Sequence, residues 1–208
     1  MGREMNLELP EVHPVVLMEG QLVLLDLSSS NSAIAGMGVN DYVENELQGR
    51  IGIGQYGEDR GIYRTAAFNG RTVHLGIDVC VPEGTPVFSV LPGRVHSFAD
   101  NDAVCDYGPT IIMEHELDGE IFYLLYGHLS RSSLNITVGQ AFNAGQQIGT
   151  IGSREENGNW FTHLHFQLIN DLQGNSGDYP GVCRPDEFDF YQKNCPDPSY
   201  FLGIMNNL

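Results

Sequence analysis

The segment NWFTHLHFQLIND, residues 159–171, places two histidines one residue apart in an apolar run typical of a β-strand. Side chains on a strand point alternately to opposite faces, so His163 and His165 share one face while Leu164 and Phe166 share the other. Two buried imidazoles without partners would cost about 1–3 kcal/mol each. We therefore expect the two histidines to serve a metal ion or proton transfer.

The sequence around this strand has the pattern of a mainly β protein with antiparallel strands. Among its 208 residues, 25 glycines and 10 prolines separate short apolar runs, as turns do in antiparallel sheets. Strands are predicted in VVLM, LVLLDL, TPVFSV, RVHSF, TIIMEHE, IFYLLYGHL, QQIGTIG and HLHFQLI. One short helix is predicted in NDYVENELQG, residues 40–49, with Asn40 or Asp41 as its cap and Gly49 at its end.

Three regions follow from these patterns. Residues 1–70 form an N-terminal extension with two apolar runs and the short helix. Residues 71–170 hold most of the predicted strands and form the central domain. Residues 171–208 are aromatic and contain several prolines and aspartates. We expect this last region to pack on the central domain as an irregular extension.

Charge and cysteine usage exclude several classes of partner. The chain carries 27 acidic and 10 basic residues, a net charge of -17, which disfavours nucleic acid and anionic membranes. The four cysteines have no C-x-x-C spacing, so a cysteine zinc site is not expected. Neither an export signal nor a membrane span is recognisable. We predict a cytoplasmic protein, or an exported one if the chain is a processed fragment.

Further ionisable residues are placed to join the histidine pair. His74 and Asp78 are four residues apart in VHLGIDV, which keeps both on one side of an extended chain, and Gly76 between them leaves space. His128 ends a long apolar strand. Each feature alone has an ordinary structural explanation, but together they predict one site. Three other histidines have no such pairing and are expected at the surface: His13, His96 and His115.

These segments resemble the lysostaphin-type zinc metallopeptidases in order and in spacing. The resemblance rests on residues 71–98, 107–130, 138–153 and 163–168, with the motifs H-x-G-x-D, G-T-P-V, Y-x-H-L and H-L-H-F. It implies the barrel-sandwich hybrid fold with a duplicated hybrid motif. The flanking sequence also resembles a subgroup in which this module lies between a kinase-like and an aminotransferase-like domain of one long chain.

The resemblance also implies roles for individual residues. His74, Asp78 and His165 fall on the ligands of one zinc ion, and His128 and His163 fall on the two catalytic histidines. The implied function is a zinc-dependent metalloendopeptidase, with peptidoglycan cross-bridge peptides as the family's usual substrate and a small peptide or amide metabolite as another. Which histidine is the general base stays open.

Two other functions are compatible with the sequence, and one segment before His163 departs from the family. A module of the same fold could bind a peptide or a partner without catalysis, and a transport-type carrier with a related fold would not need Asp78. The segment SREENGNWFT departs from the family pattern, so Trp160 could line a different groove. Arg60 and Arg64 could contact an anion, although an ordinary surface ion pair is the simpler expectation for both.

Overall fold

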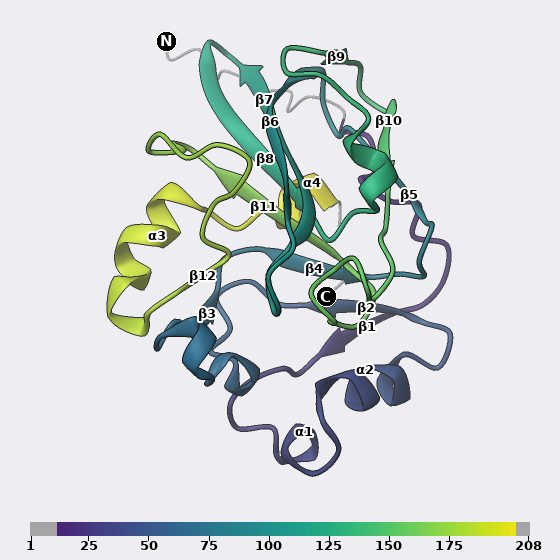
Figure 1. Cartoon of the computed structure of the whole chain (residues 1–208), viewed down its shortest axis with the longest axis vertical. Helices are drawn as coiled ribbons and strands as arrows, with labels where there is room; N and C mark the ends of the chain where they lie inside the picture. The colour runs from purple at the N-terminus through teal and green to yellow at the C-terminus, as the bar shows by residue number, and fades with distance from the viewer. Residues whose placement is uncertain (1–11, 203–208) are drawn as a thin grey trace, which may run out of the picture.

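The computed structural model describes residues 12–202 and is built around an eight-stranded sheet (Figure 1). The strand order is β1-β2-β4-β11-β8-β7-β6-β9. Its strands are β1 (Leu22–Leu25), β2 (Ile51–Gly54), β4 (Ile77–Cys80), β6 (Gly93–Asn101), β7 (Gly108–Leu117), β8 (Glu120–Gly127), β9 (Ala141–Phe142) and β11 (Leu164–Ile169). Two further sheets pair β5 (Pro86–Phe88) with β10 (Gln147–Thr150), and β3 (Val73–His74) with β12 (Val182–Cys183). The prediction of a mainly β protein with antiparallel strands is confirmed.

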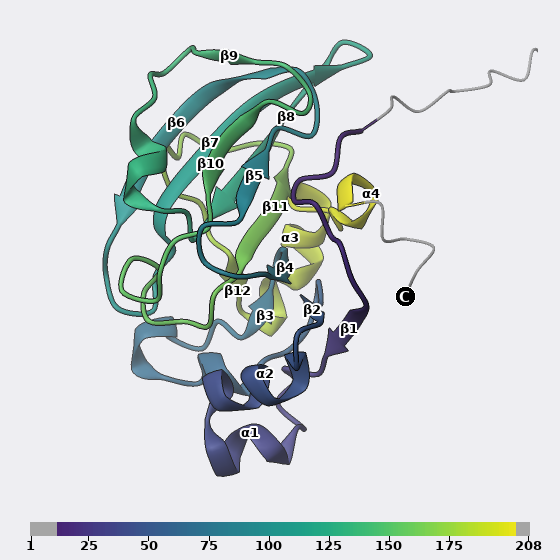
Figure 2. The same ribbon diagram turned by 90° about the vertical axis from the view of Figure 1, so that its right-hand side faces the viewer.

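One strand pair in the large sheet is parallel, and the N-terminal helices explain it. Strands β1 and β2 run in the same direction, so the chain must cross over between them. Helices α1 (Ser32–Met37) and α2 (Val39–Leu47) form that connection and lie together at one end of the molecule (Figures 1 and 2). The predicted helix is confirmed as α2, although its cap is Gly38 and not Asn40 or Asp41.

The remaining helices are short. The 3-10 helices are η1 (Gly61–Tyr63), η2 (Ala66–Phe68), η3 (Arg131–Leu134) and η4 (Pro185–Glu187). Two α-helices, α3 (Phe188–Asn194) and α4 (Ser199–Leu202), follow β12. Within the described part of the chain, no helix combines the length and the apolar character that crossing a membrane requires.

The strand predicted in VVLM is wrong. Residues 15–18 have no strand assignment, although Val15 and Val16 are fully buried. The carbonyl of Val15 accepts one hydrogen bond from the Phe88 amide at 2.8 Å. Because Pro14 has no N–H to donate, a continuous ladder cannot form there. The chain bends at Val15 and Val16 and packs against β5 without forming a strand.

Both faces of the central strands are buried, which sets the direction of the site residues. On β7 and β8, Ile111 and Leu124 belong to one core cluster, and Ile112 and Leu125 belong to another. On β11, Leu164 and Phe166 pack into the first cluster. His165 therefore points to the second cluster's side of the sheet, as strand alternation predicts.

Strands from outside residues 71–170 take part in the sheets. β2 pairs with β4, and β12 pairs with β3. The division into residues 1–70, 71–170 and 171–208 stays a prediction, and residues 1–11 and 203–208 lie outside the described part of the chain. Strands within residues 71–170 therefore pair with one strand that precedes this region in the sequence and with one that follows it.

Candidate metal and catalytic site

Strand register brings the predicted site residues together. His165 on β11 lies directly opposite Asp78 on β4, and opposite Gly127 at the end of β8. His128 follows Gly127, and His74 ends β3 four residues before Asp78. The side chains of the histidines and of Asp78 are buried, with exposed fractions between 1% and 5%.

Three of these residues point nitrogen or oxygen atoms at one position. Nε2 of His74 lies 3.0 Å from Nδ1 of His165. Oδ1 of Asp78 lies 3.2 Å from each of these two nitrogens. The three atoms therefore form a nearly equilateral triangle. This group of three buried ligand atoms could hold a metal ion.

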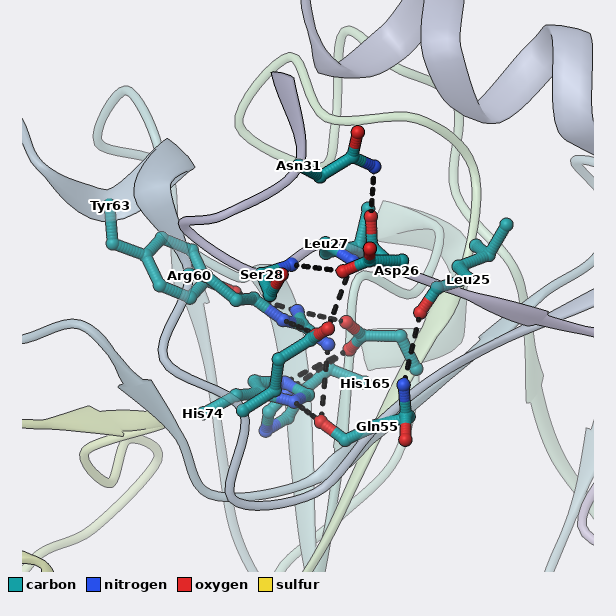
Figure 3. Close-up of polar contacts among 12 residues, drawn as sticks. Leu25, Asp26, Leu27, Ser28, Asn31, Gln55, Arg60, Tyr63, His74 and His165 are labelled. Atoms are coloured by element: carbon teal, nitrogen blue, oxygen red, sulfur yellow. Dashed lines mark hydrogen bonds and ion pairs between the residues drawn. The ribbon is translucent and has the colours of Figure 1, made fainter. Parts of the chain in front are cut away.

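Neighbouring groups fix the tautomer of each imidazole in the triangle. The carbonyl of Gln55 lies 2.9 Å from Nδ1 of His74 and can only accept, so His74 carries its proton there (Figure 3). Gln167 donates through Nε2 to the Pro180 carbonyl, which leaves its Oε1 to accept from Nε2 of His165 at 2.9 Å. Both nitrogens that face the triangle therefore present lone pairs.

The triangle fits a zinc ion. With the tautomers given above, its three atoms face one another with lone pairs, an arrangement that a cation between them would stabilise. Ligand distances of about 2.0–2.1 Å with tetrahedral angles put neighbouring ligand atoms about 3.3 Å apart, close to the 3.0 and 3.2 Å found here. Three protein ligands leave a fourth position for water, as in catalytic zinc sites.

The carboxylate of Asp78 is held ionised by its surroundings. Burial alone would raise its pKa, but the neighbouring His74 and Arg60 outweigh this effect and lower the pKa well below its ordinary value. Burial, reinforced by Arg60, lowers the pKa of His74 to about 4. At neutral pH the pair is therefore an anionic carboxylate and a neutral imidazole, the forms that bind metal.

Arg60 completes the outer layer of the site, and the expectation that it is a surface ion pair is wrong. Its side chain is fully buried, and Nη1 lies 2.6 Å from Oδ2 of Asp78. Nη1 also donates to the Tyr63 hydroxyl at 3.0 Å, and Nε lies 2.9 Å from Oε2 of Glu58 (Figure 3). Arg64 behaves as expected, in an exposed ion pair with Asp59.

The two other histidines lie beside the triangle. Nδ1 of His163 donates to the Phe161 carbonyl at 2.7 Å, so its free Nε2 is the atom that lies 3.5 Å from Oδ1 of Asp78. The rings of His128 and His163 are 4.2 Å apart. His128 has φ 61°, in the left-handed region, and its buried Nδ1 has no hydrogen-bond partner among the described residues.

Burial also changes the proton affinity of these two imidazoles. It lowers the pKa of His163, against the attraction of Asp78. Burial and the neighbouring His163 lower the pKa of His128 well below its ordinary value. Both shifts favour neutral rings, and negative charge that develops nearby would raise the proton affinity of each.

All five residues line one cavity of about 370 Å³. The histidines expected at the surface do not line it, but the expectation is wrong for His115, which is 1% exposed. His115 lies on β7 on the same face as Ile111 and Met113, and its Nδ1 donates to the Pro92 carbonyl at 3.0 Å. His13 and His96 are half-buried.

The sequence pattern of peptidase family M23 matches residues 72–178, just over half of the chain. The chain belongs to peptidase family M23. The match contains the five site residues, whereas Gln55, Glu58, Arg60 and Tyr63 precede it. This M23 chain therefore builds part of the surroundings of its site from sequence outside the family's own segment.

Individual relatives match part of the chain. The uncharacterized lipoprotein YgeR of Escherichia coli is 32% identical over 93 residues, 45% of this chain and 33% of the relative. The cell division protein DipM of Caulobacter vibrioides is 33% identical over 93 residues, 45% of this chain and 14% of the relative. The catalytic domain of the antimicrobial peptidase lysostaphin from Staphylococcus simulans is 27% identical, with a TM-score of 0.44 over 64% of this chain and 80% of that domain. The chain thus spans a third or less of the length of the two curated relatives.

Two polar residues that orient the imidazoles of the triangle were missed in the sequence, for different reasons. Gln167 continues the two-residue period of His163 and His165 along β11, so strand alternation could have found it. Gln55 acts through its backbone carbonyl, which any residue type would supply, so its sequence carries no signal. Arg60 was singled out in the sequence, but its burial depends on tertiary packing.

Proposed function

We propose that the chain is a zinc-dependent hydrolase of peptide or amide bonds, a metalloendopeptidase. The observation that carries this proposal is the triangle of lone-pair atoms on His74, Asp78 and His165, which lies in a cavity with two further buried histidines. These three residues would hold the metal. A zinc ion bound there would polarise the substrate carbonyl and lower the pKa of water toward neutrality.

The geometry of His163 suits a general base. Its Nδ1 proton is held by the Phe161 carbonyl, so Nε2 is the atom available to accept a proton from the attacking water. As the O–H bond breaks, the water oxygen forms a bond to the carbonyl carbon. His163 then delivers the proton to the amide nitrogen as the C–N bond breaks, which restores the neutral imidazole.

His128 suits stabilisation of the oxyanion that forms in this step. Its ring lines the cavity 4.2 Å from the ring of His163, measured between centroids, and an imidazole N–H aimed at a developing negative charge is most effective in a site that excludes water. The peptide hydrogen bonds from the His128 amide to Tyr107 and from the Gly152 amide to the His128 carbonyl hold its backbone in place. His128 would therefore offer its imidazole to the substrate oxygen from a fixed backbone position.

Peptidoglycan cross-bridge peptides are the first substrates to test, and small peptides or amide metabolites are the second. The chain's acidic character is compatible with either. The cellular location stays a prediction, and the name of one relative, a lipoprotein, favours an exported protein.

The test is hydrolysis of these peptides by the zinc-loaded protein, followed by mass spectrometry of the products. We expect cleavage that stops with a zinc chelator and in the variants His163→Ala and His128→Ala. His96→Ala, which changes a half-buried histidine outside the cavity, is the matched control and should keep full activity. Zinc-loaded protein that cleaves none of these substrates but binds them would instead indicate a non-catalytic binding module.

A further inference from the structure

Three aromatic side chains line the cavity that also holds the site histidines. This aromatic wall consists of Tyr63, Phe68 and Trp160, whose rings contact one another. The Tyr63 and Phe68 ring centroids are 4.7 Å apart, and Trp160 lies edge-on to Tyr63 at 5.9 Å and tilted to Phe68 at 6.3 Å. These separations are typical of packed aromatic pairs.

Most of this wall comes from outside the segment that matches the family. Tyr63 is in η1, Phe68 is in η2, and Val182, which packs with them, is in β12. All three lie outside residues 72–178. Trp160 lies in the segment that departs from the family pattern just before His163. The matched family segment alone would therefore not build the complete wall.

The wall is fixed relative to the catalytic residues. The Tyr63 hydroxyl accepts a hydrogen bond from Arg60, and the same nitrogen of Arg60 holds Asp78. The Tyr63 ring lies 6.5 Å from the ring of His74. An occupant of the space beside the wall would thus lie next to the amide bond that is cleaved.

The exposure of the wall indicates an apolar occupant. Tyr63 and Phe68 are 9% and 8% exposed, but Trp160 is only half-buried, so the indole presents free apolar surface to the cavity. Val104, which is 73% exposed, lines the same cavity. The cavity lining away from the metal triangle also includes charged side chains of both signs, so these side chains favour neither an anionic nor a cationic substrate. They are Arg71, Asp106 and Asp178.

We propose that this wall is a subsite for a bulky apolar side chain, preferentially aromatic, on a residue adjacent to the scissile amide. The proposal rests on the proposed function and deepens it by naming the substrate class. A glycine or alanine at that position would leave the apolar surface in contact with water. A phenylalanine side chain would cover it, with a gain of about tenfold or more in kcat/KM.

The first experiment measures specificity in the zinc-loaded protein. Internally quenched peptides that differ only in the residues on either side of the cleaved bond would carry glycine, alanine, leucine or phenylalanine. We expect kcat/KM to be at least about tenfold higher for phenylalanine than for glycine at one of the two positions. Trp160→Ala should reduce this ratio several-fold and Trp160→Phe should retain most of it. Ile121→Ala, at an exposed apolar residue of β8, is the control and should leave the ratio unchanged.

A binding experiment separates this proposal from the proposed function. Trp160 is the single tryptophan of the chain, so its fluorescence reports occupation of the cavity. Phenylalanine hydroxamate should change this fluorescence at a concentration at least about tenfold lower than glycine hydroxamate, which carries the same metal-binding group. This preference without cleavage of any peptide would refute the hydrolase and keep the subsite. Equal binding of the two compounds, or equal cleavage of the glycine and phenylalanine peptides, would overturn the subsite.

Discussion

Replacing Arg60 with methionine should destabilise the metal-free protein more than any exposed substitution in the same loop. The guanidinium is fully buried and lies between two carboxylates, 2.6 Å from Asp78 and 2.9 Å from Glu58. The side chains of Asp78 and Glu58 are only 2% and 8% exposed. In the Arg60→Met variant both carboxylates stay buried and lose their cation.

The expected size of this effect follows from the cost of an unpaired buried charge. Removing one partner of a buried ion pair costs about 3–5 kcal/mol, a large part of the 5–15 kcal/mol by which a typical domain is stable. Arg64 provides the matched control, because it pairs with Asp59 at 3.3 Å with side chains that are 59% and 45% exposed. Its replacement with methionine should cost less than about 1 kcal/mol.

Guanidinium chloride unfolding followed by circular dichroism, with a chelator present throughout, measures both variants. We expect Arg60→Met to lower the free energy of unfolding by at least about 3 kcal/mol, and Arg60→Lys, which keeps the charge but loses the planar fork, to give an intermediate value. Equal stabilities of the Arg60→Met and Arg64→Met variants would refute the reasoning.

Three further predictions concern the site itself. His165→Ala should lose bound zinc and activity together, whereas His163→Ala should keep most of its zinc and lose turnover; equal zinc loss in both would contradict the assigned roles. Gly76→Ala should disrupt zinc binding, because the added Cβ would lie 2.7 Å from Cε1 of His165. The control Gly36→Ala, in α1 with open space around the new Cβ, should bind zinc normally. Normal zinc binding by both variants would argue against the close packing of Gly76 on His165. Since burial lowers the pKa of His74 from 6.5 to about 4, the unfolded chain takes up the proton first, so the unfolding midpoint of the metal-free protein should fall as pH drops through that window. A constant midpoint from pH 7 to 4.5 would be inconsistent with a buried neutral imidazole.

The sequence was informative wherever the two-residue alternation of a strand determines which face of the sheet a side chain occupies. Strand alternation predicted that His163 and His165 serve one site, and the structure puts both beside Asp78. The same reasoning applied to TIIMEHE would have predicted the burial of His115, which shares a face with Ile111 and Met113. The central strands were predictable because their turns and apolar runs are local features of the sequence.

Contacts that join distant segments were not predictable in this way. Arg60 reaches Asp78 across 18 residues, and nothing local distinguishes it from the exposed Arg64. The aromatic wall joins residues from η1, from η2 and from the segment before β11. Its members come together only because the N-terminal segment folds across the site, and no local period in the sequence encodes that contact.

The zinc content of the protein tests the central claim most directly. Protein purified without a metal-affinity step would be analysed by elemental mass spectrometry beside the His74→Ala variant, before and after incubation with zinc and removal of the unbound ion. The account predicts about one zinc ion per chain in the parent and almost none in the variant. No zinc in the parent, even after incubation, would contradict it.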